Sequence, residues 1–230
     1  MTLPSRLSLI GDLERPDHVH LPADAVCYFW GEYTPYPNTG GLKWNFSPTN
    51  RLISNLKKKM DVRGTGQWTY KVAAINQVAT AFAAMYNWPV LLAMNVAFIP
   101  IPPSKARTDP MYDPRMLEIL NKMAASQKVQ LDIRDCLSSD GRYAASHETD
   151  DRPTPEQLYD ALTFSPQEGK PGVRPGLIFL YDDMLTTGAH FVAASRKLRE
   201  IFPGVSIFGN FGSRRLLPKA EDVFGVVDDL

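Results

Sequence analysis

The stretch 177–190 constrains the fold of this chain more than any other part of the sequence. It begins with five apolar residues, Leu177–Tyr181, and such a run is typical of a central strand in a parallel sheet, buried on both faces. Asp182 and Asp183 come next, and Thr186-Thr187-Gly188 then leads into a run with helical spacing. The stretch therefore predicts a buried strand, an acidic pair, a glycine turn and a helix in succession.

This order has chemical consequences at the carboxyl end of the strand, where open α/β sheets bind their ligands. Asp182 and Asp183 would lie there, and carboxylates can accept hydrogen bonds from sugar hydroxyls or help to hold a hydrated magnesium ion. The turn that follows offers free N–H groups and the positive end of a helix dipole, which favour a phosphate. Because the two acids would repel a phosphate, the pattern favours a ligand with hydroxyls at one end and phosphate at the other.

The rest of the sequence predicts an α/β protein. At 230 residues, 44% of them hydrophobic, the chain can form one α/β domain with a sizeable core. Strands alternate with helices from residue 68 onward, which implies a mostly parallel sheet. We expect strands at 26–33, 96–101, 129–133, 177–181, 205–210 and 223–227. We expect helices at 50–60, 68–87, 155–163 and 189–202, and one that starts near Asp113-Pro114 and ends by 127.

Charge and cysteine content limit the classes of function. Lys plus Arg and Asp plus Glu number 25 each, and a net charge of zero argues against broad nucleic-acid binding, which needs a basic surface. Local contact with nucleic acid stays open, because Lys57–Lys59 and Arg214-Arg215 are short basic runs. Cys27 and Cys136 have no metal-binding spacing, so we expect reduced thiols.

The sequence also bears on location. No basic and apolar signal peptide opens it. The stretch 72–104 has no charged residue, but Asn and Gln residues and Pro89 interrupt it, so we expect no membrane span. The expected location is the cytoplasm.

The stretch 177–190 resembles the phosphoribosyl-pyrophosphate (PRPP) motif of type I phosphoribosyltransferases: an apolar strand, two acids, two variable residues and Thr-Thr-Gly-x-Thr. Asp182 and Asp183 match the acids that contact the ribose hydroxyls. His190 stands where the family usually carries Thr or Ser, and histidine can still donate a hydrogen bond to phosphate. The resemblance implies a 5′-phosphate loop of Thr186, Thr187, Gly188, Ala189 and His190.

A second resemblance to this family follows the first predicted core strand. In the family, the loop after this strand binds the pyrophosphate of the donor. The loop here is Pro100–Arg107, whose basic side chains would supply positive charge and whose backbone N–H groups would supply directional hydrogen bonds. An ordinary proline-rich turn with solvated basic residues is the other interpretation of this segment. The resemblance implies a pyrophosphate loop that contains Pro103, Ser104, Lys105 and Arg107.

Within the superfamily, the chain resembles the competence-associated (ComF-like) subgroup. That subgroup carries a helix with an apolar-apolar-x-x-Leu-Lys pattern and then a strand that leads into a Pro-x-Pro loop; Leu52–Lys57 and Ile99–Pro102 follow this order here. The chain departs from the subgroup at 111–115, where Met-Tyr-Asp-Pro-Arg replaces the usual Arg-Gly-Phe-Asn. It also has no cysteine-rich zinc knuckle.

The resemblance implies a three-layer fold, with a central, mostly parallel sheet in a core of residues 66–230 and a small accessory or hood segment at 1–65. It implies a pentosyltransferase of nucleotide metabolism that transfers a phosphoribosyl group from PRPP to a nitrogenous base. Magnesium would reach the site with PRPP, and Asp182 and Asp183 would help to hold it. The implied catalytic residues are Asp182, Asp183 and Thr186, although Thr186 is a poor general base at a position where some relatives place Asp. We also expect a homodimer.

Some features leave the function open. Thr186 stands at a position where some relatives place an acidic residue, which leaves a non-catalytic alternative. In this alternative the chain is a regulatory protein that binds PRPP or a nucleotide without transferring a group and contacts nucleic acid or a protein partner. We assign no role to His18-Val19-His20, since no partner ligands for a metal are evident. Six aromatic residues could stack on an acceptor base or could pack the core of their own segment: Tyr28, Phe29, Trp30, Tyr33, Trp44 and Phe46.

Overall fold

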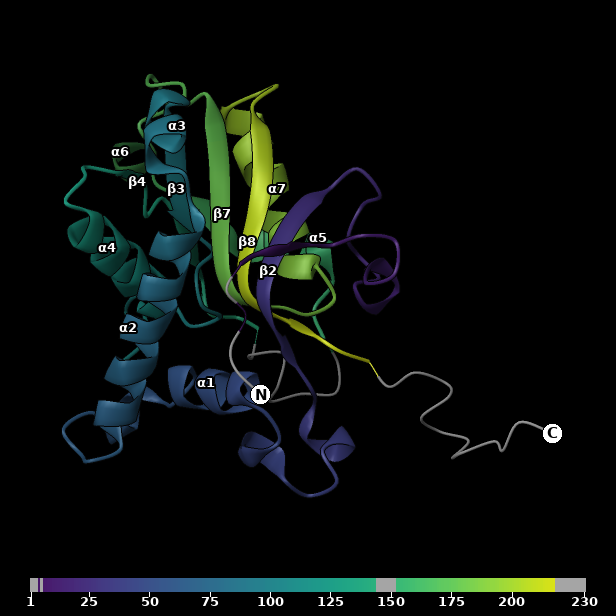
Figure 1. Ribbon diagram of the computed structural model, residues 1–230. Coiled ribbons are helices and arrows are strands. Elements are labelled where there is room, and N and C mark those ends of the chain that lie inside the picture. Colours follow the sequence, from purple (N-terminus) through teal and green to yellow (C-terminus); the bar gives the residue numbers. More distant parts are fainter. Residues whose placement is uncertain (1–3, 5, 144–151, 218–230) are drawn as a thin grey trace.

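The structure, a computed structural model, describes residue 4 and residues 6–143 and 152–217. At its centre is a six-stranded sheet (Figure 1), with the strands in the order β1 (Ser8–Leu9), β2 (Val26–Tyr33), β8 (Ser206–Arg215), β7 (Leu177–Leu185), β3 (Val96–Pro100) and β4 (Asp132–Ile133). The pairing of β1 with β2 is antiparallel, and the other pairings in this sheet are parallel. The predicted α/β class with a mostly parallel central sheet is therefore confirmed.

Helices cover both faces of this sheet (Figure 1). One face packs against α1 (Pro48–Leu56), α2 (Trp68–Met85), α3 (Trp88–Ala93) and α4 (Arg115–Gln127). The other face packs against α7 (Ala189–Ile201), which contacts α5 (Pro155–Ala161). The remaining elements are a hairpin of β5 (Leu137–Ser139) and β6 (Leu162–Phe164), the short α6 (Pro166–Gly169), and 3-10 turns at Arg15–Asp17, Tyr36–Asn38, Lys43–Asn45 and Met60–Val62.

The first half of β7 joins the two helical layers, because its side chains alternate between the faces of the sheet. Leu177, Phe179 and Tyr181 pack with α1, α2 and α4. Ile178 and Leu180 pack on the other side with α7. All five are buried, as the sequence predicts, and each such apolar side chain stabilises the fold by roughly 1.5–3 kcal/mol.

β7 is longer than predicted. We expected it to end before the acidic pair, but its pairing with β8 continues, with Asp182 opposite Phe211 and Leu185 opposite Arg214. The acidic pair therefore lies within the strand and not in a turn after it. Because side chains alternate along a strand, Asp182 and Asp183 leave the backbone on opposite sides.

Most other predicted elements are present with shifted ends. The strand expected at 129–133 is reduced to the two residues of β4, and the helix expected from Asp113-Pro114 begins at Arg115, directly after the proline. The strand predicted at 223–227 lies outside the described residues. In the part of the chain that the structure describes, no helix combines the length and the hydrophobicity needed to cross a bilayer.

β2 comes from the segment that we expected to form an accessory lobe, and it pairs in parallel with β8 in the central sheet. Of its aromatic residues, Phe29 and Trp30 are buried in the core, whereas Trp44 and Phe46, beyond the strand, are exposed. Cys27 of β2 and Cys136 are both free and buried, in line with the expected reduced thiols. Burial raises the pKa of each thiol to about 12, so both stay protonated at neutral pH.

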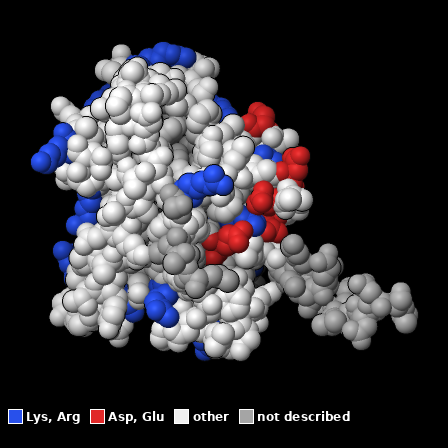
Figure 2. Space-filling model, in the orientation of Figure 1, with Lys and Arg blue, Asp and Glu red and all other residues white. Residues whose placement is uncertain are grey.

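Charged side chains are unevenly distributed on the face drawn in Figure 2. Asp and Glu gather there over the N-terminal segment ahead of β2, whereas Lys and Arg are scattered. Arg214, from one of the two basic runs, is buried and forms ion pairs with Asp17 at 3.0 Å and with Glu32 at 2.5 Å. Its charge is therefore paired with two acids and adds little to a basic surface.

The backbones of β8 and β7 approach closely at Gly212 of β8. A Cβ at this position would lie 2.9 Å from the carbonyl oxygen of Asp183. Because a backbone oxygen cannot turn aside, Gly212→Ala should lower the free energy of unfolding by about 1–3 kcal/mol, measured by denaturant titration. Gly66→Ala is the matched control, since a Cβ there meets nothing within 4 Å. Equal effects of the two substitutions would contradict this prediction.

Candidate functional site

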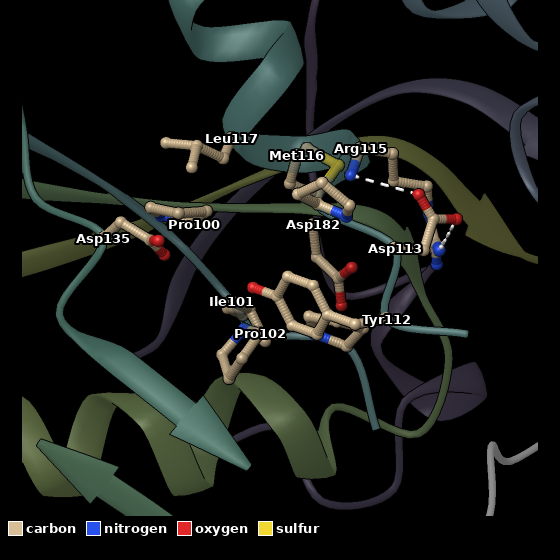
Figure 3. Close-up of a pocket in the computed structure, with 12 residues that line it drawn as sticks. Pro100, Ile101, Pro102, Tyr112, Asp113, Arg115, Met116, Leu117, Asp135 and Asp182 are labelled. Carbon is tan, nitrogen blue, oxygen red and sulfur yellow. Dashed lines mark hydrogen bonds and ion pairs between the residues drawn. The ribbon is translucent and has the colours of Figure 1, made fainter. Parts of the chain in front are cut away.

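A pocket lies at the carboxyl ends of β3 and β7, where the sequence predicts a ligand site. It contains about 330 Å³ of empty space, part of which is open solvent. The proline-rich loop after β3, the start of α4 and the acidic part of β7 form its wall together (Figure 3). Its lining residues are Pro100, Ile101, Pro102, Pro103, Tyr112, Asp113, Pro114, Arg115, Met116, Leu117, Asp135 and Asp182. Two segments that are far apart in the sequence, the proline loop and the acidic motif, thus meet in one pocket.

Asp182 directs its carboxylate into this pocket (Figure 3). Its Oδ1 accepts a hydrogen bond from the N–H of Asp183 at 2.7 Å. Burial, and after it the negative charge of Asp183, raises the pKa of Asp182 to about 7. A carboxyl group that titrates near neutral pH can both accept and donate a proton, and such a group in a pocket is typical of a functional site.

Asp183 has a different environment, although it is the next residue. It is only 3% exposed, and its Oδ2 accepts a hydrogen bond from Nε of Arg115 at 2.7 Å. The Nζ of Lys57 lies 3.1 Å from its Oδ1. Burial alone would raise the pKa of Asp183, but Arg115 and Lys57 outweigh burial and hold that pKa well below its ordinary value. Asp183 is therefore ionised and paired on both of its oxygens.

These contacts belong to a longer chain of ion pairs. A second guanidinium nitrogen of Arg115 lies 2.7 Å from Oδ2 of Asp113. The same oxygen lies 2.7 Å from Nζ of Lys71, a lysine of α2 that is 1% exposed. Burial lowers the pKa of Lys71, and Asp113 opposes this effect. The chain Lys57–Asp183–Arg115–Asp113–Lys71 thus connects α1, α2, α4 and β7.

Lys71 also fixes the end of α1. Its ammonium group donates hydrogen bonds to the carbonyl oxygens of Leu56 at 2.6 Å and Lys58 at 3.0 Å. Lys57 lies between these two residues, so Lys71 holds the backbone from which Lys57 reaches Asp183. The end of α1 is therefore coupled to the site by hydrogen bonds as well as by charge.

Our sequence reasoning did not identify these partners of Asp183. It noted Lys57 as the end of a helix pattern and Asp113 as a helix start, and it noted Arg115 as a departure from the ComF-like subgroup. Each of these residues lies at or beside a helix terminus, which was the available signal. That Lys57 and Arg115 converge on Asp183, with Asp113 bound to Arg115, follows from the packing of the helices on the sheet.

A second pocket lies on the other side of the proline-rich loop, with about 390 Å³ of empty space, part of which is open solvent. His190 contributes to its wall and is partly buried. Burial, and after it the charge of Lys57, lowers the pKa of His190 to about 4, so this side chain is neutral at physiological pH. The lining residues are Ile101, Pro102, Pro103, Ser104, Ser139, Tyr143, Leu158, Ala161, Leu162, His190 and Ala193.

The residues assigned to the pyrophosphate loop divide into two groups. Pro103 lines both pockets, and Ser104 lines the second one. Lys105 and Arg107 line neither pocket. Arg107 is bound to both the carboxylate and the carbonyl oxygen of Asp135, each at 2.7 Å. Lys105 is half-buried, and its Nζ lies 3.8 Å from the carboxylate of Asp109. The positive charge that the sequence assigns to this loop thus lies outside the two pockets.

The predicted 5′-phosphate loop is held by the N-terminal segment. His18, which is 1% exposed, donates from Nδ1 to the carbonyl oxygen of Thr186, and the N–H of His20 donates to that of Thr187 at 2.8 Å. Gly188 has φ +90°, and a Cβ there would lie 3.1 Å from the backbone nitrogen of Leu21. Ala189, which follows, begins α7 and is buried. A segment to which we had assigned no role therefore supports the loop.

Three acids line the first pocket, but Asp113 is paired with Arg115 and Lys71, and the carboxylate of Asp135 is paired with Arg107. This leaves Asp182 as the carboxylate suited to a magnesium ion, since Mg²⁺ is commonly held by one or two carboxylates together with substrate phosphates. No group of three or more His, Cys, Asp or Glu side chains that could hold a metal occurs within residues 6–143 and 152–217. The donor set fits an ion that arrives with its ligand and not a protein-only metal site.

Comparison with models of known protein families and with curated proteins finds no match for this chain.

Asp182→Asn should isolate the titration of this carboxyl group. Asn keeps the oxygen that accepts the N–H of Asp183 but cannot ionise. Because the pKa of Asp182 in the folded state is raised from 3.8 to about 7, the wild type should lose stability relative to the variant as pH rises through this range. Urea unfolding at several pH values between about 4 and 8 measures the difference. A difference that does not change with pH would refute the assignment.

His18→Ala should weaken the support of the loop. It removes the donor to the carbonyl oxygen of Thr186 in a part-buried hydrogen bond, so the free energy of unfolding should fall by about 1–3 kcal/mol. Hydrogen exchange at the amides of Thr187 and Gly188 should become faster. His20→Ala is the matched control, because it keeps the backbone N–H that binds Thr187 and alters an exposed side chain. Faster exchange in the control to the same extent would count against the role of His18.

Proposed function

We propose that the chain binds PRPP, or a closely related ribose phosphate, at the carboxyl ends of β3 and β7 and transfers the phosphoribosyl group to a nitrogenous acceptor. One observation carries this proposal. The proline-rich loop after β3 and Asp182 of β7, which the resemblance assigns to two parts of the same donor, line one pocket. The order of the motifs and the shared pocket therefore point to the same ligand.

The proposed reaction breaks the bond between carbon 1 of the ribose and pyrophosphate, and it forms a bond from this carbon to a nitrogen of the acceptor, which loses a proton. The ribose passes through an oxocarbenium-like state, so positioning and charge stabilisation supply most of the catalysis. Magnesium, when bound, neutralises the charge that develops on pyrophosphate. Asp182 is suited to orient a ribose hydroxyl or to receive a proton, because it faces the pocket and its pKa is raised to about 7.

The start of α7 supports the proposed place of the 5′-phosphate. Gly188 precedes the helix in a left-handed conformation and has no side-chain cap, so the first N–H groups of α7 need another partner. His190 adds a neutral donor and no positive charge. Phosphate binding here would therefore depend mainly on backbone N–H groups and on the helix dipole.

A regulatory protein that binds PRPP or a nucleotide without transfer is the second candidate. Two observations favour it: both oxygens of Asp183 are paired with cations, and Thr186 supplies no acid at the position where some relatives carry one. Such a protein would use the same pocket and the same magnesium but would lack turnover.

Pyrophosphate release from PRPP distinguishes the two candidates. With magnesium and a panel of purine, pyrimidine and pyridine bases, the wild type should release pyrophosphate with at least one base. Asp182→Asn should reduce the rate by about 100-fold or more, because the group that orients the ribose is lost. Asp24→Asn, which alters an exposed acid in the N-terminal segment, should leave the rate unchanged.

Calorimetry of PRPP binding completes this test. Magnesium-dependent binding without release from any base would favour the regulatory protein. No magnesium-dependent binding at all would contradict both candidates.

A further inference from the structure

Arg115 is the cation in the site that two acids share. Its Nε lies 2.7 Å from Oδ2 of Asp183, and a terminal nitrogen lies 2.7 Å from Oδ2 of Asp113. Its side chain is 18% exposed and lines the pocket into which Asp182 points (Figure 3). Arg115 is thus in contact both with the buried ion pairs and with the space in which a ligand would lie.

Each of these two acids has a second cation of its own. Asp113 keeps Lys71 at 2.7 Å, and Asp183 keeps Lys57 at 3.1 Å. Removing a partner from a buried ion pair is costly when it leaves a charge uncompensated. Here the departure of Arg115 would leave neither acid without a cation. Lys57 and Lys71 differ from Arg115 in that neither lines the pocket, so neither is placed to exchange its acid for a ligand there.

We infer that Arg115 is an exchangeable cation, which releases Asp183 and binds the diphosphate group of the donor in the pocket. The inference rests on the proposed function and names a residue that the sequence motif does not include. The planar fork of a guanidinium group suits two phosphate oxygens as well as it suits a carboxylate. An anionic ligand in the pocket would therefore compete with Asp183 for the same donors.

The basic residues that the sequence assigns to pyrophosphate are less suited to this role. Arg107 donates to the carbonyl oxygens of Asp135 at 2.7 Å and Leu137 at 3.3 Å and forms an ion pair with the carboxylate of Asp135. It holds together the segment after β4, and its side chain does not line the pocket. Diphosphate binding through Arg115 requires a smaller rearrangement, since Arg115 already lies in the pocket wall.

Calorimetry of inorganic pyrophosphate binding in the presence of magnesium tests whether Arg115 exchanges Asp183 for the ligand. Two variants should change the affinity in opposite directions. Arg115→Gln should weaken binding by roughly tenfold or more, the range typical of a lost hydrogen bond to a charged group. Asp183→Asn should instead strengthen it, because the acid that competes for Arg115 is neutralised. A merely structural role of the ion pair would weaken binding in both variants. Arg199→Gln, at an exposed position of α7, is the control and should have no effect.

The outcomes separate this inference from the proposed function. Weaker pyrophosphate binding in Asp183→Asn, loss of binding in Arg107→Gln with Arg115→Gln unaffected, or no binding by the wild type would each overturn the exchange. If Arg115→Gln does not fold, Arg115→Lys keeps the charge and should still bind more weakly, since an ammonium lacks the fork. If the two variants change pyrophosphate binding as expected but the wild type releases no pyrophosphate from PRPP, the exchange is supported and the transfer reaction is refuted.

Discussion

The buried carboxylate of Asp183 is the constraint on which the rest of the site depends. It lies within the central strand of the sheet, and an unpaired charge at this depth would cost several kcal/mol. The cations that neutralise it stand at the end of α1 and at the start of α4. Both helices must therefore end or begin where they do, and the layer that they form is tied to β7 by charge as well as by apolar packing.

The same arrangement gives two neighbouring acids opposite properties. Asp183 is paired and stays ionised, and its fixed negative charge then helps to keep a proton on Asp182 up to neutral pH. The difference arises because alternation along a strand sends the two side chains to different surroundings. Two acids that are adjacent in the sequence thus have different roles. Asp183 forms buried ion pairs with two helices, and Asp182 titrates in a pocket.

What could be predicted from the sequence was local. The apolar run of β7, the glycine turn and the start of α7 each follow from a few adjacent residues, and the structure has them at or near the predicted positions. The extension of β7 to Leu185 was missed because its polar residues are held by β8, a partner that no local pattern reveals. Arg115 and His18 were missed for the same reason, since their partners lie far away in the chain. The meeting of the proline loop and Asp182 was predicted only through a resemblance in motif order.

The position of β2 has a consequence for how the chain reaches its final form. Val26 aligns with Phe208, so β2 must wait for one of the last described segments of the chain before it can form its parallel hydrogen bonds. His18 and His20 lie a few residues before β2 and bind the loop that follows β7. During synthesis, this N-terminal segment would leave the ribosome early and remain without its partners while the sheet is assembled. The loop proposed to bind phosphate therefore gains its support late, when the two ends of the described chain come together.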